Sequence, residues 1–257
     1  MNNGPIDGVS TRIAIVTGGG SGIGRAIAER LATDGMNVAV FDRDNKSAET
    51  VAAKIQADGG TALGYAVDVS DRLRLEGVVD DVRNALGPAT VLVNNAGVTG
   101  FEPFLKISIQ TWNRLLDVNL TGTFHCCQTV LPDMIAARWG RIVNISSSGG
   151  QSGNPYMAHY VASKAGVIGL TKALALEFGP KGVTVNTIPP GFIDTPLLRA
   201  AESAGQLGEG VDFHAARTPV RRVGVPADIA AACSFLVREE AGYVNGQVFG
   251  VNGGRIT

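Results

Sequence analysis

Short, continuous apolar runs alternate with helical patterns along almost the whole chain, and this alternation restricts the fold more than any other feature. The runs predict strands over residues 12–17, 37–41, 62–67, 91–93, 141–146, 183–188 and 247–251. Helical spacing predicts helices over 25–35, 45–58, 72–86, 109–137, a stretch from about 155, and 226–237. Strands that are apolar throughout are typical of a parallel sheet covered on both faces. The sequence therefore predicts one doubly wound α/β domain with a seven-stranded parallel sheet, and a ligand crevice at the carboxyl ends of the strands.

Length and charge restrict the organisation and the partners. The 257 residues suffice for one large domain, and the 45% hydrophobic content suffices for a large core. We expect a polar tail over 1–10 and a single domain over 11–257. The net charge of −1 gives no sign of a nucleic-acid partner or an anionic membrane surface. Because we find neither a signal-peptide pattern nor a membrane-spanning apolar run, we expect a cytoplasmic protein.

The cysteines give no sign of a disulfide framework or of a metal site. There are three of them, Cys126, Cys127 and Cys233, and two are adjacent in the sequence. An odd number with this spacing does not predict paired bridges, and no Cys/His spacing resembles a zinc site. We therefore expect reduced thiols and no bound metal.

A glycine-rich turn connects the first predicted strand to the first predicted helix. It contains Gly18, Gly22 and Gly24, with Ser21 and Ile23 among them. Glycines at this place let the backbone approach a pyrophosphate, which the N–H groups and positive dipole of a helix N-terminus attract. The spacing Gly-x-x-x-Gly-x-Gly differs from the commoner Gly-x-Gly-x-x-Gly, and a purely structural turn is the alternative. We predict a dinucleotide site here.

An acidic residue, Asp42, closes the second predicted strand 24 positions after Gly18. A carboxylate there accepts hydrogen bonds from the adenosine ribose hydroxyls and repels a 2′-phosphate, which favours NAD over NADP. Arg43 could instead bind that phosphate, unless it pairs with Asp44, so NADP stays an alternative. Asp42 could also be an ordinary loop acid or the cap of the second helix.

Polar and small residues also close the third and fourth strands. Asp68 could bind the adenine edge with Val69 packing on the ring, or it could only cap the following helix. Asn95, Ala96 and Gly97 follow the fourth strand, where small residues would let a cofactor lie over the sheet. An asparagine-rich turn without a ligand is the simpler alternative.

The stretch over 141–164 offers three reactive groups to one space. Ser147 follows a predicted strand, and Tyr160 and Lys164 share one face of the next helix because they are four positions apart. A tyrosine ordinarily titrates near pH ~10, too high for a general base at neutral pH, and a neighbouring cation favours its phenolate. We therefore predict that Lys164 lowers the pKa of Tyr160. The pattern Tyr-x-x-x-Lys is weak alone, and an amphipathic helix with an incidental Tyr and Lys is the alternative.

Taken together, these motifs resemble the short-chain dehydrogenases/reductases over about residues 11–254. The resemblance rests on TGGGSGIG at 17–24, NNAG at 94–97, Asn119 in DVNLTG, Ser147, YVASK at 160–164, PPGFIDT at 189–195 and GQVFGVNGG at 246–254. One departure is Pro189, where the family usually has a small residue. The resemblance implies a Rossmann domain and an NAD(P)-dependent oxidoreductase that interconverts a secondary alcohol and a ketone.

The resemblance also implies a role for each site residue. Tyr160 would exchange a proton with the substrate oxygen, and Lys164 would lower its pKa and bind the nicotinamide ribose. Ser147 would orient the substrate oxygen, and Asn119 would hold a proton-relay water, unless it only bonds backbone in its helix. Cofactor contacts would come from Gly18, Ser21, Gly22, Ile23, Gly24, Asp42, Arg43, Asp68, Val69, Asn95, Ala96, Gly97, Tyr160, Lys164, Pro190, Gly191, Ile193 and Thr195.

Within the family, the spacing of Ser147 and Tyr160 and the C-terminal motif are most similar to bacterial 3-oxoacyl-(acyl-carrier-protein) reductases. Two basic residues that bind the carrier protein in that group fall on Arg138 and Lys181, although cations near helix ends are favourable in any case. Those reductases commonly use NADPH, whereas Asp42 favours NAD. The chain is therefore also similar to NAD-dependent 3-hydroxyacyl-CoA, cyclic hydroxyacyl-CoA, hydroxysteroid and secondary-alcohol dehydrogenases. A dinucleotide-binding sensor without catalysis and a sugar-nucleotide epimerase or dehydratase are alternatives of other classes.

For the substrate side, we expect contacts from Ser147, Gly149, Gln151 and Phe192. The substrate would be a small molecule, either a CoA thioester or an acyl group on a carrier. The segment over 195–219 is long for a structureless connection, which predicts a lid rather than a surface excursion. His159 does not share a helix face with its neighbour Tyr160, so we interpret it as a packing or pocket-edge residue and not as a catalyst. The helices over 109–137 and around Tyr160 are more apolar than one sheet face requires, which predicts a homodimer or homotetramer.

Overall fold

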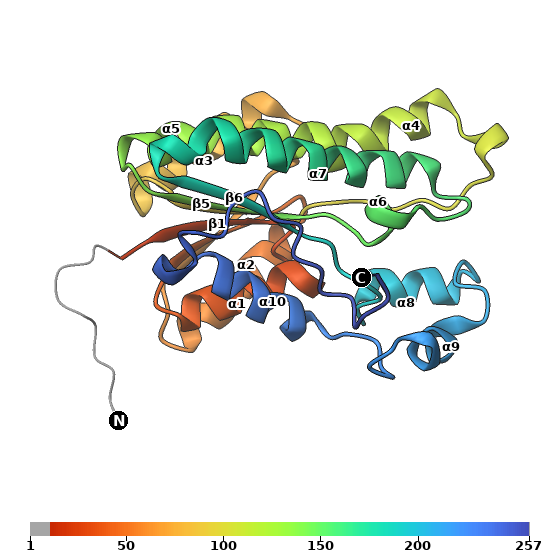
Figure 1. Cartoon of the computed structure of the whole chain (residues 1–257). Helices are drawn as coiled ribbons and strands as arrows, with labels where there is room; N and C mark the ends of the chain where they lie inside the picture. The colour runs from red at the N-terminus through yellow and green to blue at the C-terminus, as the bar shows by residue number, and fades with distance from the viewer. Residues whose placement is uncertain (1–10, 257) are drawn as a thin grey trace.

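The computed structural model describes residues 11–256, so the predicted polar tail over 1–10 lies outside the described residues. A parallel sheet forms its centre, with strands in the order β3-β2-β1-β4-β5-β6 (Figure 1). The strands are β1 (Ile13–Thr17), β2 (Asn37–Asp42), β3 (Ala62–Ala66), β4 (Val91–Asn94), β5 (Gly140–Ile145) and β6 (Val183–Ile188). The strand order reverses between β1 and β4, which opens a crevice at their carboxyl ends. The predicted doubly wound α/β fold is confirmed.

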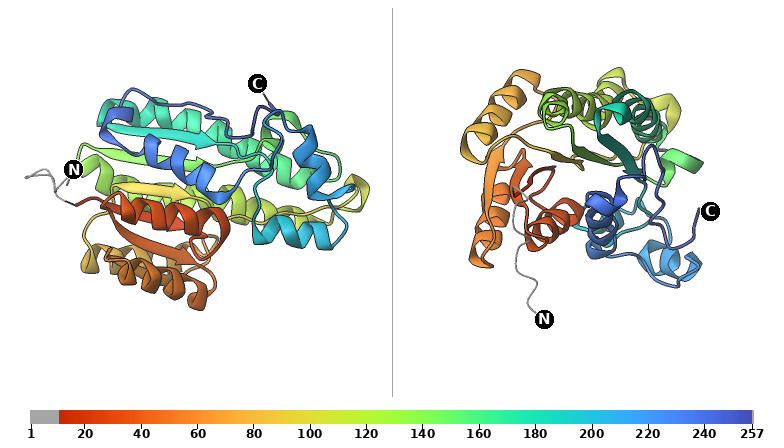
Figure 2. Two further views of the ribbon diagram at one scale, coloured as in Figure 1. Left: turned by 90° about the horizontal axis from the view of Figure 1, so that it is seen from below. Right: turned by 60° about the vertical axis from the view of Figure 1, so that its left-hand side comes forward.

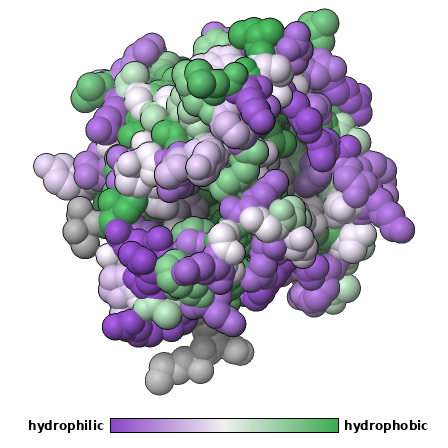
Figure 3. Space-filling view, turned by 90° about the vertical axis from the view of Figure 1, so that its right-hand side faces the viewer, coloured by the Kyte–Doolittle hydropathy of each residue, from purple (hydrophilic) through white to green (hydrophobic). Residues whose placement is uncertain are grey.

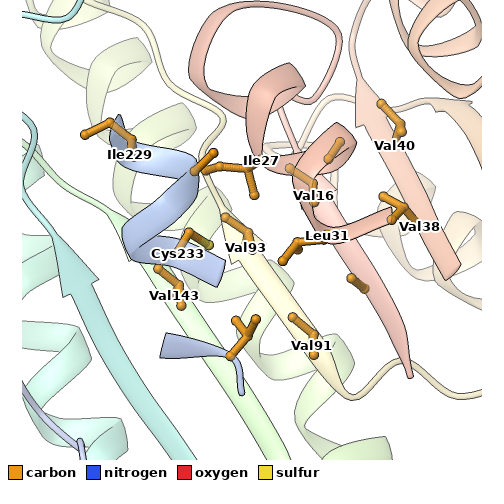
Figure 4. Packing of buried hydrophobic residues seen from close by; sticks show 14 of the residues in the cluster. Val16, Ile27, Leu31, Val38, Val40, Val91, Val93, Val143, Ile229 and Cys233 are labelled. Carbon is orange, nitrogen blue, oxygen red and sulfur yellow. The ribbon is translucent and has the colours of Figure 1, made fainter. Parts of the chain in front are cut away.

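Helices cover both faces of the sheet, as Figures 1 and 2 show. One face carries α1 (Gly22–Thr33), α2 (Asn45–Ala57) and α10 (Pro226–Leu236), and the other carries α3 (Arg72–Ala85), α5 (Gly122–Ala136) and α7 (Ala158–Phe178). Alternate residues of each strand enter different cores: Val16 packs with α1 and α10, whereas Ile15 packs with α3 and α5. Figure 4 shows the first of these cores, where Ile27 and Leu31 of α1 lie over the strands. Burial on both faces explains why the strands are apolar throughout.

The strand predicted over 247–251 is reduced to isolated bridges among the described residues. Val248 forms a parallel bridge with Thr187, and Val251 forms one with Pro190. Gly246 has φ +71°, a conformation that other residues adopt rarely, so the chain bends as it enters this segment. The segment therefore runs along β6 as an irregular edge, and the predicted sheet of seven strands has six.

The helix predicted over 109–137 is interrupted at its centre. It consists of α4 (Ile109–Leu116), a π-helical turn over Asp117–Thr121, and α5. Asn119 lies in the π-helical turn. A π turn inserts an extra residue into a helix and occurs often at functional sites. The continuous predicted helix is thus correct in extent, with an irregularity at its candidate site residue.

The segment after β6 contains more regular structure than the sequence predicts. Two helices, α8 (Pro196–Ser203) and α9 (Gly210–Arg217), occupy most of the stretch over 195–219. The hydroxyl of Thr195 accepts a hydrogen bond from the N–H of Leu198 and caps α8. Ala201, Leu207 and Val211 form a small apolar cluster with Phe101, Phe192, Leu198 and Val223. The sequence analysis predicts no helix in this stretch, whereas the structure has two short helices that this cluster stabilises; the lid stays a prediction.

The three cysteine thiols are reduced and buried. Cys126, Cys127 and Cys233 are free and buried, so the expectation of no disulfide framework agrees with the structure. Burial raises the pKa of the Cys127 thiol to about 12, which keeps it protonated and unreactive. In the part of the chain that the structure describes, we find no helix with the length and apolarity to cross a bilayer.

Candidate active site

A groove of about 940 Å³ follows the carboxyl ends of the strands. Twelve of the residues predicted to bind cofactor line it: Gly18, Ser21, Gly22, Ile23, Asp42, Arg43, Asp68, Val69, Asn95, Ala96, Gly97 and Thr195. Gly24, Tyr160, Lys164, Pro190, Gly191 and Ile193 are not among the lining residues. The sequence analysis missed the residues of α4 and the π turn that form the opposite wall, including Asn113, Arg114 and Val118. A short amphipathic helix carries no signal for such a role, because only the tertiary fold brings it over the groove.

The glycine turn leaves no room for side chains. Gly18 has φ +60°, and a Cβ there would lie 2.9 Å from the Cα of Ala96. A Cβ on Gly24 would lie 2.1 Å from the carbonyl oxygen of Gly18, so this glycine lets α1 pack against the turn. A Cβ on Gly20 would lie 2.8 Å from Asp42 Oδ2, and the N–H of Gly20 donates a hydrogen bond to the same oxygen at 3.0 Å. At its glycines the turn thus presents backbone to the groove beside a helix N-terminus, next to Ser21 and Ile23, which suits a pyrophosphate.

Asp42 faces this turn and does not cap the second helix. Its Oδ1 accepts a hydrogen bond from the N–H of Asp44 at 3.1 Å, while Asp44 itself caps α2 by accepting from the N–H of Lys46. Asp44 also accepts a hydrogen bond from Ser47 at 2.6 Å rather than pairing with Arg43. The capping alternative for Asp42 is therefore wrong.

Asp68 is also not a helix cap. Its Oδ1 accepts hydrogen bonds from the N–H and the hydroxyl of Ser70 at 2.9 and 2.6 Å, and Asp71 caps α3 instead. Its neighbour Val69 approaches α5, where a Cβ on Gly122 would lie 2.5 Å from Val69 Cγ2. Asp68 therefore stays available at the same end of the groove as Asp42 and Asp44.

Thr17 and Asn95 join the loops that follow β1 and β4. The hydroxyl of Thr17 accepts hydrogen bonds from the N–H groups of Asn95 and Ala96, both at 3.0 Å. The amide of Asn95 donates to the carbonyl oxygens of Thr17 and Gly18, again at 3.0 Å. Asn95 thus holds the glycine turn next to the end of β4. The role of Thr17 was not predicted, although its place at a strand end next to glycine is a signal that could have been used.

Lys164 lies in a buried position beside the end of β5. Its side chain is 5% exposed, and its Nζ donates a hydrogen bond to the carbonyl oxygen of Ile145 at 3.0 Å. Burial lowers its pKa to about 8. A Cβ on Gly97 would lie 3.2 Å from Lys164 Nζ and 3.1 Å from Asn119 Oδ1, so these two groups flank the same glycine.

Tyr160 and Ser147 also come together, as the sequence predicts. Burial raises the pKa of the Tyr160 phenol, and a hydrogen bond with Ser147 opposes that shift. The direction differs from the predicted lowering by Lys164, because loss of hydration is the larger effect for a phenolate here. Ser147 in turn accepts a hydrogen bond from the N–H of Gly149 at 3.1 Å. Tyr160 therefore contacts Ser147, while Lys164 lies one helical turn further along α7, and the phenol is protonated.

Asn119 is fully buried and connects the π turn to α7. Its amide donates to the carbonyl oxygen of Val98 at 3.0 Å and to the hydroxyl of Ser163 at 2.9 Å, and its Oδ1 accepts from the N–H of Val98 at 2.8 Å. Ser163 donates onward to the carbonyl oxygen of Tyr160 at 2.7 Å. Both donor hydrogens of the amide are thus used, and one lone pair of Oδ1 stays free on the side of Gly97 and Lys164.

His159 is buried immediately before Tyr160. Its Nδ1 accepts a hydrogen bond from the N–H of Tyr160 at 3.0 Å, and its Nε2 is buried without a partner among the described residues. A Cβ on Gly100 would lie 2.9 Å from that Nε2. These contacts agree with the packing role expected for His159.

The predicted substrate residues lie beyond the catalytic groups. Gly149 is adjacent to Ser147, and a Cβ there would lie 2.8 Å from the amide nitrogen of Asn154. Gln151 is exposed on the short helix α6 (Gly149–Ser152). Phe192 stacks on His214 of α9 with ring centroids 4.0 Å apart. These residues border the catalytic groups on the side where α8 and α9 lie.

The two basic residues considered for a carrier protein lie elsewhere. Arg138 precedes β5 and Lys181 precedes β6, so both lie at the amino ends of parallel strands. They are close together, since a Cβ on Gly182 would lie 2.2 Å from the carbonyl oxygen of Arg138. Within one chain, this edge of the sheet is opposite to the catalytic groups.

Comparison with known proteins agrees with this geometry. The pattern of the short chain dehydrogenase family matches residues 12–205. The 3-oxoacyl-(acyl-carrier-protein) reductase FabG of Staphylococcus aureus is 40% identical over 245 residues, which cover 95% of this chain and 98% of that protein. The reductase of the same name from Haemophilus influenzae is 38% identical over 246 residues, 95% of this chain and 97% of that protein.

A solved structure shows the same fold. The crystal structure of a variant of actinorhodin polyketide ketoreductase with NADPH superposes with a TM-score of 0.91 at 36% identity, and the match covers 95% of this chain and 97% of that one. A nicotinamide dinucleotide is therefore the cofactor to expect in the groove, and the backbone of the glycine turn at the N-terminus of α1 fits its pyrophosphate. The chain belongs to the short-chain dehydrogenase family and is an oxidoreductase related to ketone reductases.

Proposed function

We propose that this protein is an NAD(H)-dependent oxidoreductase that interconverts a secondary alcohol and a ketone, with a 3-oxoacyl or 3-hydroxyacyl thioester as its substrate. The observation that carries the proposal is the hydrogen bond between Tyr160 and Ser147, together with the place of Lys164 Nζ beside Gly97, which lines the groove. A dinucleotide-binding sensor would not need these groups together. Their presence therefore favours catalysis over binding alone.

The proton chemistry follows from the environment of Tyr160. A phenol ordinarily titrates near pH ~10 and burial raises the pKa of Tyr160 further, so the phenol is protonated at neutral pH and can donate its proton to a ketone oxygen. Ser147 would orient that oxygen by a hydrogen bond. The nicotinamide, when bound, would supply the hydride to the carbonyl carbon. In the direction of alcohol oxidation the phenolate is required, and the Ser147 hydrogen bond and a protonated Lys164 would favour it.

Lys164 and Asn119 would return the proton to Tyr160. Lys164 would also bind the nicotinamide ribose hydroxyls. The free lone pair of Asn119 Oδ1 and the Nζ of Lys164 lie on either side of Gly97, where a Cβ would be within 3.2 Å of both. The lack of a side chain at Gly97 leaves space for a water there. We infer that this water would link Lys164 to solvent.

The charges at the adenosine end of the groove favour NAD over NADP. Asp42, Asp44 and Asp68 line the groove beside the guanidinium of Arg43, and the second guanidinium of the groove, that of Arg114, lies on the wall formed by α4. Three carboxylates would repel a 2′-phosphate more than Arg43 would attract it, because like charges a few ångströms apart interact unfavourably at a protein surface. The ketoreductase described above was crystallised with NADPH, so the proposed preference for NAD rests on the residues of this chain and not on that relative.

The substrate class is supported by the relatives. Proteins with 38–40% identity over nearly the whole chain are named for reduction of 3-oxoacyl groups on acyl carrier protein. An apolar cluster around Phe101, Phe192 and Leu198 lies beside the catalytic groups and suits an acyl chain. The same cluster also suits a steroid or a cyclic alcohol, which is the second candidate.

Titration with NADH and NADPH, followed by reduced-nicotinamide fluorescence, tests the cofactor. We expect tighter binding of NADH, and an Asp42→Asn variant should shift the preference toward NADPH by about tenfold, the effect of roughly 1.4 kcal/mol from one charge. An Asp58→Asn variant, which changes an exposed carboxylate outside the groove, is the matched control. Tighter NADPH binding by the unmodified protein would contradict the proposal.

A panel of substrates tests the reaction. We expect acetoacetyl thioesters to be reduced with a higher kcat/KM than cyclic ketones and 3-ketosteroids. Faster turnover of the cyclic compounds would favour the second candidate. If NADH binds but none of the ketones is reduced, the oxidoreductase proposal for these substrate classes is wrong.

A further inference from the structure

Five side chains form a continuous row of cations and aromatic rings on the face that carries α8 and α9. In order they are Arg217, Phe213, His214, Phe192 and Arg255. The guanidinium of Arg217 lies 5.2 Å from the Phe213 ring, and that of Arg255 lies 4.7 Å from the Phe192 ring. Phe213 and His214 meet edge to face, and His214 stacks on Phe192. The row joins helix α9, the loop after β6 and the C-terminal segment.

The two guanidinium groups of this row are not neutralised by acids. Neither forms an ion pair with a carboxylate of residues 11–256, whereas Arg222 pairs with Asp228 at 2.6 Å and Arg199 with Asp194 at 2.7 Å. Burial and the charge of Arg217 lower the pKa of Arg255, so the two cations are close enough to repel each other. Aromatic faces hold guanidinium groups in place without cancelling their charge. The arrangement therefore concentrates positive charge at one place.

The loop that carries Phe192 connects this row to the strand end that carries Ser147. The N–H of Ser148, which follows the catalytic serine, donates a hydrogen bond to the carbonyl oxygen of Pro190 at 2.9 Å. Phe192 lies two residues further along the same loop. Arg255 also reaches α9, since it donates a hydrogen bond to the carbonyl oxygen of His214 at 3.4 Å. Figure 3 looks onto this side of the molecule, where hydrophilic side chains border a recess.

We propose that Arg217 and Arg255 bind the phosphate of the phosphopantetheine arm that carries the acyl thioester. The inference rests on the proposed function, because it gives the charged part of the substrate a place while the acyl end meets Ser147 and Tyr160. Guanidinium groups suit this ligand, since their planar N–H donors match phosphate oxygens in bidentate pairs. The aromatic rings against which the two guanidinium groups pack hold their N–H donors in place before the substrate binds.

The phosphate has two sources with the same chemistry. Coenzyme A and acyl carrier protein both present the acyl group on a phosphopantetheine arm, and the cations would contact only the part that they share. By contrast, an acetoacetyl thioester of N-acetylcysteamine keeps the reacting end and lacks the phosphate. Comparing the three substrates therefore isolates the contribution of the phosphate.

The test is the ratio of kcat/KM for acetoacetyl-CoA to kcat/KM for acetoacetyl-N-acetylcysteamine. The unmodified protein should prefer the CoA thioester by about tenfold or more, as expected for charge-assisted hydrogen bonds. The Arg217→Gln/Arg255→Gln double variant should bring the ratio close to one. Higher ionic strength should lower the ratio of the unmodified protein only, since salt screens exposed charges.

Two single variants serve as controls. Arg222→Gln removes a cation of the adjacent turn that Asp228 already neutralises, and Arg74→Gln removes an exposed cation on α3. Both should keep the ratio of the unmodified protein within about twofold, because a surface ion pair or a distant charge contributes little. As a second readout, 4′-phosphopantetheine should inhibit reduction of the N-acetylcysteamine thioester more strongly than pantetheine does, and the double variant should lose this difference.

The outcomes separate this inference from the proposed function. Good turnover of both thioesters with a ratio near one in the unmodified protein, or an unchanged ratio in the double variant, would overturn the phosphate site and leave the proposed function intact. Absence of turnover with every thioester would overturn the proposed substrate and this inference with it. If acetoacetyl-acyl carrier protein loses as much kcat/KM in the double variant as acetoacetyl-CoA, the shared arm phosphate is bound. A loss confined to CoA would overturn that assignment in favour of its nucleotide phosphates.

Discussion

The ammonium group of Lys164 donates a hydrogen bond to the carbonyl oxygen of Ile145 at 3.0 Å, so the helix that carries Tyr160 is tied to the strand that ends at Ser147. This bond crosses between α7 and the last residue of β5. It fixes the side chain of Lys164 in a buried position, where its charge is costly. The buried charge of Lys164 therefore lowers the free energy of unfolding of the protein.

Replacing Lys164 tests that cost. The pKa of Lys164 is lowered by burial to about 8 from 10.5, so the folded state binds fewer protons than the unfolded state between these pH values. The free energy of unfolding should consequently rise with pH across this window in the unmodified protein. Lys164→Met should lack the rise and should be more stable at pH 7 by up to about 3 kcal/mol, the equivalent of the pKa shift.

Urea unfolding at pH 7 and pH 9.5 measures both the free energy of unfolding at pH 7 and its rise with pH. Neither measurement depends on the activity of the variant. The Met variant loses the hydrogen bond to Ile145, which offsets part of the gain. Equal pH dependence of the two proteins would contradict the account of Lys164 as a buried cation.

Gly100 is predicted to matter because of His159. A Cβ at this position would lie 2.9 Å from His159 Nε2 and 3.2 Å from Cε1. Gly100→Ala should therefore displace His159, whose ring accepts the N–H of Tyr160, and should destabilise the protein by about 1–3 kcal/mol. Its kcat should fall more than its affinity for the dinucleotide, because the displaced helix turn carries the acid.

Gly77→Ala is the matched control for this prediction. Gly77 lies in α3, and a Cβ there would meet nothing within 4 Å. Alanine should stabilise this helix by up to about 1 kcal/mol. Thermal unfolding and steady-state kinetics of the two variants compare them directly, and similar behaviour would show that the contact with His159 is unimportant.

Much of this site follows from sequence patterns because its chemistry is local. The glycine turn, Asp42 and the pair Tyr160 and Lys164 all lie in stretches where strand, turn and helix signals agree. At Gly18 and Gly24 a Cβ would clash with the backbone, so only glycine fits these positions. Twelve predicted cofactor residues accordingly line the groove.

Other features depend on contacts between distant segments, and sequence patterns do not contain them. The direction of the Tyr160 pKa depends on how deeply the phenol is buried, which no spacing reveals. The helices α8 and α9 are stabilised because Leu207 and Val211 pack against Phe192, a residue of another segment. Similarly, residues of α4 and of the π turn line the groove, and only the tertiary fold brings them there.

The association of subunits stays a prediction from the apolar helices. Leu176 on α7 is 82% exposed and Phe124 on α5 is 42% exposed, both on helices predicted to form an interface. We expect a homodimer or homotetramer through these helices, because exposed apolar surface is typical of interfaces. Leu176→Glu and Phe124→Glu should lower the mass measured by light scattering.

Leu73→Glu provides the control for association. Leu73 on α3 is 81% exposed, on a helix outside the predicted interface, so this variant should keep the mass of the unmodified protein. A monomeric unmodified protein at micromolar concentration would contradict the prediction.

The measurement that tests the central claim most directly is the turnover of Tyr160→Phe together with its binding of NADH. The variant lacks only the phenolic hydroxyl, so the groove and its glycine turn should still bind NADH within about twofold, while reduction of acetoacetyl-N-acetylcysteamine should fall by about 10²–10⁴, the usual contribution of a general acid. Retained NADH binding with that loss would support Tyr160 as the proton donor. Near-normal turnover by the variant would contradict the catalytic assignment.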